Sequence, residues 1–259
     1  MKTELNEQDI KAAVIEKLRS RLLNQDAVLI NEMVFSGRDR RADLVIANGH
    51  IQAFEIKSDL DTLRRLSGQV DDYLEKFDKL TLVVSSRYLE DALSTDERVG
   101  VWEAVKKKES IEIRIRRAGK ISSVSCAPTL CEFMLKSELV SFLRSKKVIA
   151  DFRRISREEL VGLCSSFPSS TVRKSAIACI KSRYSDLSSA FLESNTGAIE
   201  PAAIAGLSKS KVRRKRLEEE LGWGTVRATE KSREINLSRF FPDGDIPDSI
   251  PRRILVPQS

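Results

Sequence analysis

Residues 41–59 have the sequence Arg41-Ala-Asp-Leu-Val-Ile-Ala-Asn-Gly-His-Ile-Gln-Ala-Phe-Glu-Ile-Lys-Ser-Asp59. Two short, largely apolar segments flank Asn48-Gly49, a dipeptide that tolerates positive φ at both positions and is typical of a β-hairpin turn. The pattern therefore predicts two antiparallel strands. Asp43, Glu55 and Lys57 are embedded in these strands, and burying such ions is costly unless they are paired or hold a cation.

The length of the hairpin loop determines whether the two acids share a face. A two-residue loop at Asn48-Gly49 would place them on opposite faces of the sheet. A three-residue loop over residues 47–49 would put Asp43 opposite Ala53, so that the two acids become diagonal neighbours on the same face as Lys57. We favour this longer loop because the other face would then carry an apolar stripe, formed by Leu44, Ile46, Phe54 and Ile56.

The length and composition of the chain predict a folded protein with its own core. Its 259 residues suffice for one large domain, or for one domain with a helical extension, and 41% of them are apolar. The N-terminus lacks the apolar segment of a signal peptide, and no stretch reaches the length of a membrane span. We therefore expect a cytoplasmic protein that does not associate with membranes. A formal net charge of +7 is compatible with a nucleic-acid partner.

The cysteines and the single histidine exclude several classes of site. The spacing of the cysteines is irregular and contains no Cys-x-x-Cys pair, so we predict reduced structural thiols rather than an iron–sulfur cluster or a zinc site. His50 stands alone, at the expected hairpin tip, which argues against a Ser-His-Asp or Cys-His mechanism. The four cysteines are Cys126, Cys131, Cys164 and Cys179.

Hydrophobic periodicity predicts an α/β domain in the first half of the chain. Ser58 or Asp59 is expected to cap a helix that follows the hairpin, with Asp61 in its first turn. An apolar run at Leu80–Ser85 follows, so the order strand–helix–strand favours a right-handed crossover between parallel strands. Further elements are expected as a helix over 6–23, a strand over 27–35, a helix near 87–93, a segment at 99–105 and a strand over 111–116.

Beyond Pro128 the periodicity becomes helical. A domain over residues 1–125 would thus be followed by a helical region over 126–226 and by an extended or poorly ordered tail over 227–259, which four prolines punctuate. Helices are expected at 130–146, 156–165, 171–191 and 202–221.

A basic run lies in the last of these expected helices. It can be a solvated helix compensated by the acids that follow it, or a helix that contacts phosphates and gains from counterion release. The run consists of Lys209, Lys211, Arg213, Arg214, Lys215 and Arg216.

The arrangement Asp43…Glu55-Ile56-Lys57 resembles the motif of the PD-(D/E)XK nuclease superfamily, although Ala42 replaces the nominal proline. Gln69 and Tyr73, spaced four residues apart on the expected helix, resemble the Gln-x-x-x-Tyr element of exonucleases related to the RecB nuclease domain. The resemblance covers about residues 5–117, and the stretch from Arg41 to Ser85 is most similar to small stand-alone bacterial and prophage proteins. It implies a restriction-endonuclease-like α/β core, with a mixed central sheet flanked by helices and followed by an α-helical C-terminal region.

The same resemblance implies a metal-dependent DNA nuclease that acts in repair, recombination or mobile-element defence. Asp43, Glu55 and the carbonyl of Ile56 would hold Mg²⁺, or Mn²⁺ in its place, and the metal would activate the attacking water. Lys57 would orient that water or stabilise charge on the phosphate. Further candidates are Glu32, Gln69 and Tyr73 at the catalytic site, and Arg41 and Ser58 for phosphate contact.

A second hypothesis is a catalytically silent module that binds DNA or protein through its helical C-terminal region. The partner bound by that region would be another protein or a second copy of the chain in a homodimer. This hypothesis predicts binding without metal-dependent turnover. An RNA-directed nuclease is a weaker third hypothesis, since only 6% of residues are aromatic and no base-stacking platform is evident.

Overall fold

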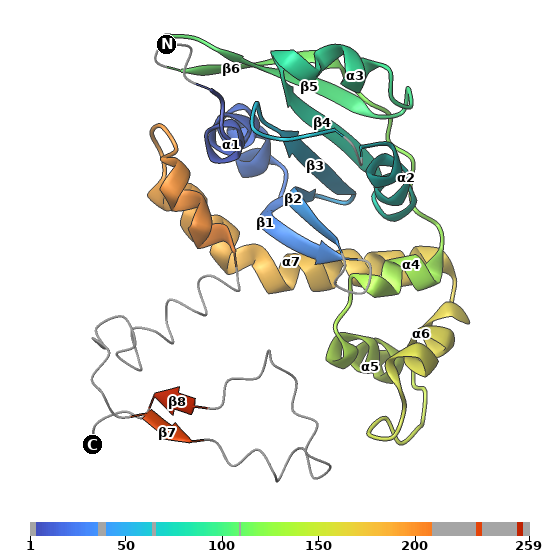
Figure 1. The fold of residues 1–259 in the computed structure, drawn as a ribbon. Helices are drawn as coiled ribbons and strands as arrows, with labels where there is room; N and C mark the ends of the chain where they lie inside the picture. Colours follow the sequence, from blue (N-terminus) through green and yellow to red (C-terminus); the bar gives the residue numbers. More distant parts are fainter. Residues whose placement is uncertain are drawn as a thin grey trace. The chain divides into compact units, whose positions relative to one another are not determined.

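A six-stranded mixed sheet forms the centre of the protein (Figure 1). The computed structural model describes residues 4–35, 40–63, 66–108, 110–208, 232–234 and 253–255. The strands lie in chain order, with the β3–β4 and β4–β5 pairs parallel and the others antiparallel. The α/β fold class, a mixed sheet flanked by helices and followed by helices, is thereby confirmed. The strands are β1 (Val28–Phe35), β2 (Arg40–Ala47), β3 (Ile51–Lys57), β4 (Lys79–Ser85), β5 (Gly100–Lys106) and β6 (Ile111–Arg117).

The β2–β3 hairpin has a three-residue loop, but it is displaced by one residue from the predicted one. Ala47 pairs with Ile51, so the loop consists of residues 48–50, and Gly49 takes its positive φ of 101° in the middle. Continued along the strands, this register puts Asp43 directly across from Glu55 and not across from Ala53. The predicted pairing is therefore wrong. The prediction that Asp43 and Glu55 share a face is confirmed, because the partner of Asp43 moves by two residues along β3 and side chains two residues apart lie on the same face.

One face of the sheet is covered by α1 (Glu7–Asn24). Asn6 caps this helix by accepting a hydrogen bond from the Asp9 amide, as expected for an Asn at the N-cap. The predicted apolar stripe of the hairpin lies in the core beneath α1, together with Trp102 and Ile113 from the far strands. Burial of this stripe fixes which way the hairpin faces.

The opposite face is covered by α2 (Leu66–Lys76) and α3 (Leu89–Leu93), the latter preceded by the 3-10 turn η2 (Ser86–Tyr88). The predicted cap of α2 is wrong, because that helix begins only at Leu66. Ser58 instead donates its amide and hydroxyl hydrogens to Asp61, at 2.8 and 2.6 Å, within a turn that precedes the helix.

The chain after β6 is helical. The predicted helix over 130–146 is divided in two at residues 133–135, and only the turn η3 (Pro201–Leu207) is described in the range predicted as a helix over 202–221. No helix in the described part of the chain is long and apolar enough to cross a membrane. The helices are α4 (Ala127–Glu132), α5 (Lys136–Ser145), α6 (Arg157–Ser165) and α7 (Ser169–Ser194).

The long helix α7 connects the helical segment to the sheet and runs beside β1 (Figure 1). Ser188 on α7 accepts a hydrogen bond from the Leu29 amide at 2.9 Å, and Asn31 donates to the Ile204 carbonyl in η3 at 3.3 Å. Sheet and helices belong to one compact unit, which includes the described residues up to Ser208. In a separate unit, β7 (Ser232–Glu234) pairs with β8 (Arg253–Leu255), and the rest of the predicted tail lies outside the described residues.

Asp78 links the sheet to α7. Its carboxylate, 1% exposed, accepts bonds from the amides of Ile51 and Val124 at 2.6 and 2.9 Å. It also receives two bonds from the guanidinium of Arg173 on α7, at 2.7 and 2.5 Å. His50 at the hairpin tip completes this group, 3.8 Å from the carboxylate. A buried carboxylate needs such donors, so Asp78 fixes where α7 lies on the sheet.

We predict that Asp78→Ala lowers the free energy of unfolding by about 3–5 kcal/mol, because it leaves the Arg173 guanidinium buried without its partner. Urea denaturation followed by circular dichroism measures the change. Asp151→Ala is the matched control: Asp151 is half exposed, its ion pairs are 3.4 and 3.6 Å long, and we expect a loss below about 1 kcal/mol. Equal small losses in both variants would contradict the assigned role of Asp78.

Candidate functional site

Glu55 occupies the centre of the predicted acidic site, and both of its carboxylate oxygens have donors. The residue is 5% exposed. Lys57 donates to Oε1 at 2.9 Å, and the hydroxyl of Tyr73 on α2 donates to Oε2 at 2.5 Å. The sheet and α2 thus bring together Glu55, Lys57 and Tyr73, and the three form a closed ionic and hydrogen-bonded group.

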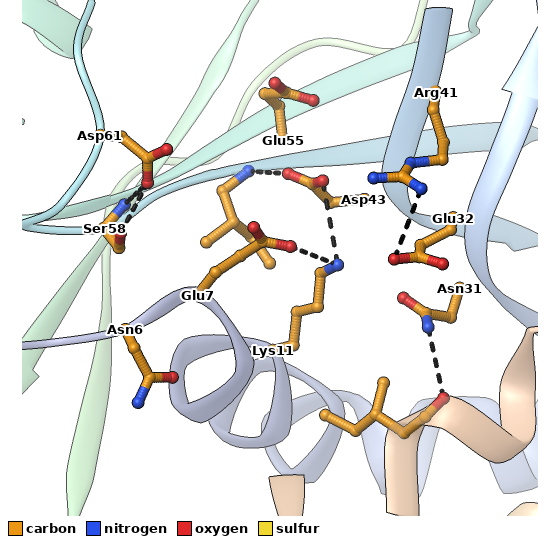
Figure 2. Close-up of polar contacts among 12 residues, drawn as sticks. Asn6, Glu7, Lys11, Asn31, Glu32, Arg41, Asp43, Glu55, Ser58 and Asp61 are labelled. Carbon is orange, nitrogen blue, oxygen red and sulfur yellow. Dashed lines mark hydrogen bonds and ion pairs between the residues drawn. The ribbon is translucent and has the colours of Figure 1, made fainter. Parts of the chain in front are cut away.

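Asp43 is held from the other side, by the backbone of β3 and by α1. Its Oδ2 accepts a hydrogen bond from the Ile56 amide at 2.7 Å, and its Oδ1 lies 3.9 Å from the ammonium of Lys11 (Figure 2). Lys11 is fully buried and lies 2.6 Å from Glu7 on the same helix. Sequence reasoning missed Lys11, whose signal is a lysine on the buried face of an amphipathic helix, directly after Ile10.

Burial and mutual proximity shift the pKa values of this cluster. Burial, followed by repulsion from Glu55, raises the pKa of Asp43 to about 7. Burial opposes the charge of Lys57, but the ion pair with Glu55 outweighs it and raises the pKa of the ammonium. Burial and the nearby Glu55 carboxylate also raise the pKa of Tyr73, so its hydroxyl remains a donor. Asp43 is therefore about half protonated near pH 7 and mostly protonated below it, which reduces the repulsion between the two acids.

The charges of the cluster are already balanced, which bears on the predicted Mg²⁺ site at Asp43, Glu55 and Ile56. A cation would have to compete with Lys57 and Tyr73 for Glu55, and with Lys11 for Asp43. Among the described residues, no group of three or more acidic, histidine or cysteine side chains is placed to hold a metal ion. The residues as arranged fit a neutralised ion network better than a cation site, and binding of Mg²⁺ or Mn²⁺ stays a prediction.

The other predicted site residues are placed less centrally. Glu32 on β1 has a positive φ of 58° and is 3.7 Å from Arg41, whose side chain is 58% exposed (Figure 2). Gln69 is half buried, and in the described part of the chain it makes no hydrogen bond to either acid. Ser58 is 2% exposed and bonded to Asp61, so its hydroxyl is not available to a phosphate.

The predicted basic run Lys209–Arg216 lies outside the described residues. A different basic surface is present in the segment that joins α5 to α6. From Arg144 to Arg157 the sequence holds a single acid, Asp151, against six cations, a signal that sequence reasoning passed over. Five of the six are exposed: Arg144, Lys146, Lys147, Arg153 and Arg154.

The ends of this basic loop are fixed to the helices. Arg144 lies over the ring of Phe152 at 5.5 Å, and Lys146 lies over Phe142 at 5.7 Å. Arg157, the half-buried sixth cation, donates to the carbonyls of Cys131 and Met134 at the end of α4, at 3.1 and 2.9 Å. The loop therefore presents its remaining charges from an ordered base.

The four cysteines are all free thiols. Cys131 and Cys164 are buried in the helical segment, and burial raises the pKa of the Cys131 thiol to about 12. Their thiols are therefore protonated and packed as apolar groups, in accord with the structural role expected for them.

Comparison with known proteins identifies one family and one curated relative that cover most of this chain. The model of the family described as Bacteriophage P4 protein cII matches residues 1–208. The protein cII of Enterobacteria phage P4 is 37% identical over 214 residues, which cover 81% of this chain and 80% of the relative. A solved structure of a protein of unknown function from Silicibacter pomeroyi covers 59% of this chain and 99% of its own, with 17% identity and a TM-score of 0.38. A score of this size identifies neither fold nor function.

These matches correct the functional interpretation of the acidic site. The family that spans both the sheet and the helical segment is that of a phage cII protein and not of a nuclease. The interpretation of the chain as a Mg²⁺-dependent phosphodiesterase, whether endonuclease or exonuclease, is therefore wrong. The likeness of Asp43, Glu55 and Lys57 to the PD-(D/E)XK motif stays a prediction about ancestry and carries no activity.

The raised pKa of Asp43 predicts a specific pH dependence of stability. Between about pH 4 and pH 7 the folded state binds a proton at Asp43 that the unfolded chain releases, so the free energy of unfolding falls as the pH rises. A pKa raised from 3.8 to about 7 corresponds to ~4 kcal/mol at most. Asp43→Asn cannot ionise and should lack this loss.

Urea denaturation of both proteins from about pH 5 to about pH 8 measures the difference. We expect wild type to lose stability relative to Asp43→Asn across this range. If the difference in free energy of unfolding between the two proteins stayed constant, or if wild type became relatively more stable as the pH rises, Asp43 would be ionised in the folded protein throughout this range.

Proposed function

The chain belongs to the bacteriophage P4 protein cII family, and we propose that its molecular function is to bind DNA through the basic loop between α5 and α6. The observation that carries this proposal is the cluster of five exposed cations with one half-exposed acid among them. The sheet then serves as the scaffold on which α7 positions the helical segment.

The cations of the loop are available to a polyanion. Arg153 and Arg154 are 94% and 90% exposed, and among the described residues their acidic partner is Asp151, at 3.4 and 3.6 Å. Exposed pairs of this length contribute little and are readily exchanged. A DNA backbone can therefore replace Asp151 as the partner and release condensed counterions in doing so.

The geometry of the loop suits contact with a nucleic-acid backbone. Lys147 adopts a positive φ of 59°, which turns the chain sharply at the end of α5. Ile149, two residues later, is 99% exposed and stands between the two groups of cations. An apolar side chain among phosphate-contacting cations can pack against sugars or base edges in a groove. Ionic contacts would thus provide affinity, and Ile149 would add an apolar contact in the groove.

The salt dependence of binding provides a quantitative expectation. If all five exposed cations contact phosphates, the slope of log K against log salt reaches about −4.5 on duplex DNA. We predict that Arg153→Ala with Arg154→Ala makes this slope smaller by about 2 and weakens binding by at least about tenfold near physiological salt. Fluorescence anisotropy with a labelled duplex, at several salt concentrations, measures both quantities.

The matched control removes two exposed cations elsewhere on the protein. Arg98 and Lys120 each pair with a neighbouring acid, Asp96 and Glu97, at 2.7 and 2.5 Å. Arg98→Ala with Lys120→Ala changes the net charge equally and should leave the slope within experimental error. Equal effects of both double variants would show that only net charge matters, and an unchanged loop variant would refute the loop as the DNA surface.

A further inference from the structure

The two edges of the sheet differ. At the β1 edge, α7 and η3 lie against the strand and bond to it through Ser188 and Asn31. At the other edge, β6 has no hydrogen-bonded neighbour on its outer side among the described residues (Figure 1). We propose that β6 pairs antiparallel with β6 of a second copy of this chain, so that the two sheets become continuous across a two-fold axis.

The hydrogen-bond pattern of the β5–β6 hairpin determines which backbone groups face outward. The Lys107 amide donates to the Ser110 carbonyl at 2.8 Å, so these two residues form a hydrogen-bonded pair. Because such pairs alternate along an antiparallel ladder, every second residue of β6 turns its amide and carbonyl away from β5. The residues whose backbone amide and carbonyl face away from β5 are Ile111, Ile113 and Ile115.

Because the amides of Ile111, Ile113 and Ile115 face away from β5, a two-fold axis can pass between Ile113 of one copy and Ile113 of the other. In that register Ile113 lies opposite Ile113 of the second copy, and Ile111 lies opposite Ile115. Glu112 then lies opposite Arg114 of the second copy, at a non-hydrogen-bonded position where side chains approach most closely. A shift of the axis to Arg114 would instead place two arginines opposite each other, which like-charge repulsion disfavours.

The side chains of β6 suit this register on both faces. Glu112 and Arg114 are 44% and 37% exposed and lie 2.8 Å apart in one chain, so two copies would form a ring of four alternating charges. On the α1 side, Ile115 is 54% exposed, whereas Ile111 packs against the core beneath α1. Pairing would bring the exposed Ile115 next to Ile111 of the second copy and remove its apolar surface from water.

Sedimentation equilibrium of the full chain measures the dimer dissociation constant, and substitutions that reverse the charges at Glu112 and Arg114 test the proposal. Glu112→Arg places two arginines opposite each other at both cross-strand positions, and Arg114→Glu places two glutamates there. We expect each single variant to raise the dimer dissociation constant at least about tenfold, or ~1.4 kcal/mol. The double variant E112R/R114E restores opposite charges between positions 112 and 114, both within one chain and across the two-fold axis, and should return the constant to near the wild-type value.

Ile115→Pro tests the backbone contribution. Its amide faces away from β5, so proline removes an outward donor without breaking the β5–β6 ladder, as edge strands permit. We expect a monomer whose thermal unfolding temperature is close to that of wild type. A wild-type monomer would overturn the proposal, and so would a dimer that neither single charge variant nor Ile115→Pro weakens. Failure of the double variant to recover would refute the register with its axis at Ile113.

Discussion

The need to neutralise a buried carboxylate in the middle of the sheet governs the rest of this structure. The buried carboxylate of Glu55 accepts hydrogen bonds from Lys57 and from Tyr73, and Tyr73 comes from α2. Asp43 in turn lies near Lys11 of α1. One polar cluster therefore ties together the hairpin and a helix from each face of the sheet. Asp78 and Arg173 repeat the same solution at the other end of the strands, where they hold α7.

Local pattern in the sequence is enough to predict the β2–β3 hairpin, the strands β1, β4 and β6, the parallel crossover and the shared face of Asp43 and Glu55, whereas β5 is expected only as a segment without an assigned structure. The hairpin loop was misplaced by one residue because Gly49 can take its positive φ at more than one position in a three-residue loop. The partners of the buried charges were not predictable in this way. Lys11 and Asp43 are far apart in sequence, as are Asp78 and Arg173, so only the packed structure brings each pair together. The break at residues 133–135 also depends on packing, since Phe133 belongs to the core of the sheet.

The acidic site shows how one arrangement of residues can support different interpretations. Two acids and a lysine on one face resemble a catalytic set, yet their oxygens are engaged by lysines, a tyrosine and a backbone amide. Family membership then assigns the chain to phage cII proteins. Exposed charge is concentrated elsewhere, on the loop between α5 and α6, where cations outnumber acids and have only weak partners. Buried charge thus maintains the fold of this protein, and the proposed contact with DNA rests on exposed charge.

The most direct test of this separation is the DNA affinity of the double variant Glu55→Gln with Lys57→Met, measured by anisotropy under conditions where circular dichroism shows it folded. Removing both members of the pair avoids a buried charge without its partner. The account predicts a lower free energy of unfolding with DNA affinity and salt slope equal to those of wild type. Loss of DNA binding in the folded variant would contradict it and place the acidic cluster within the binding surface.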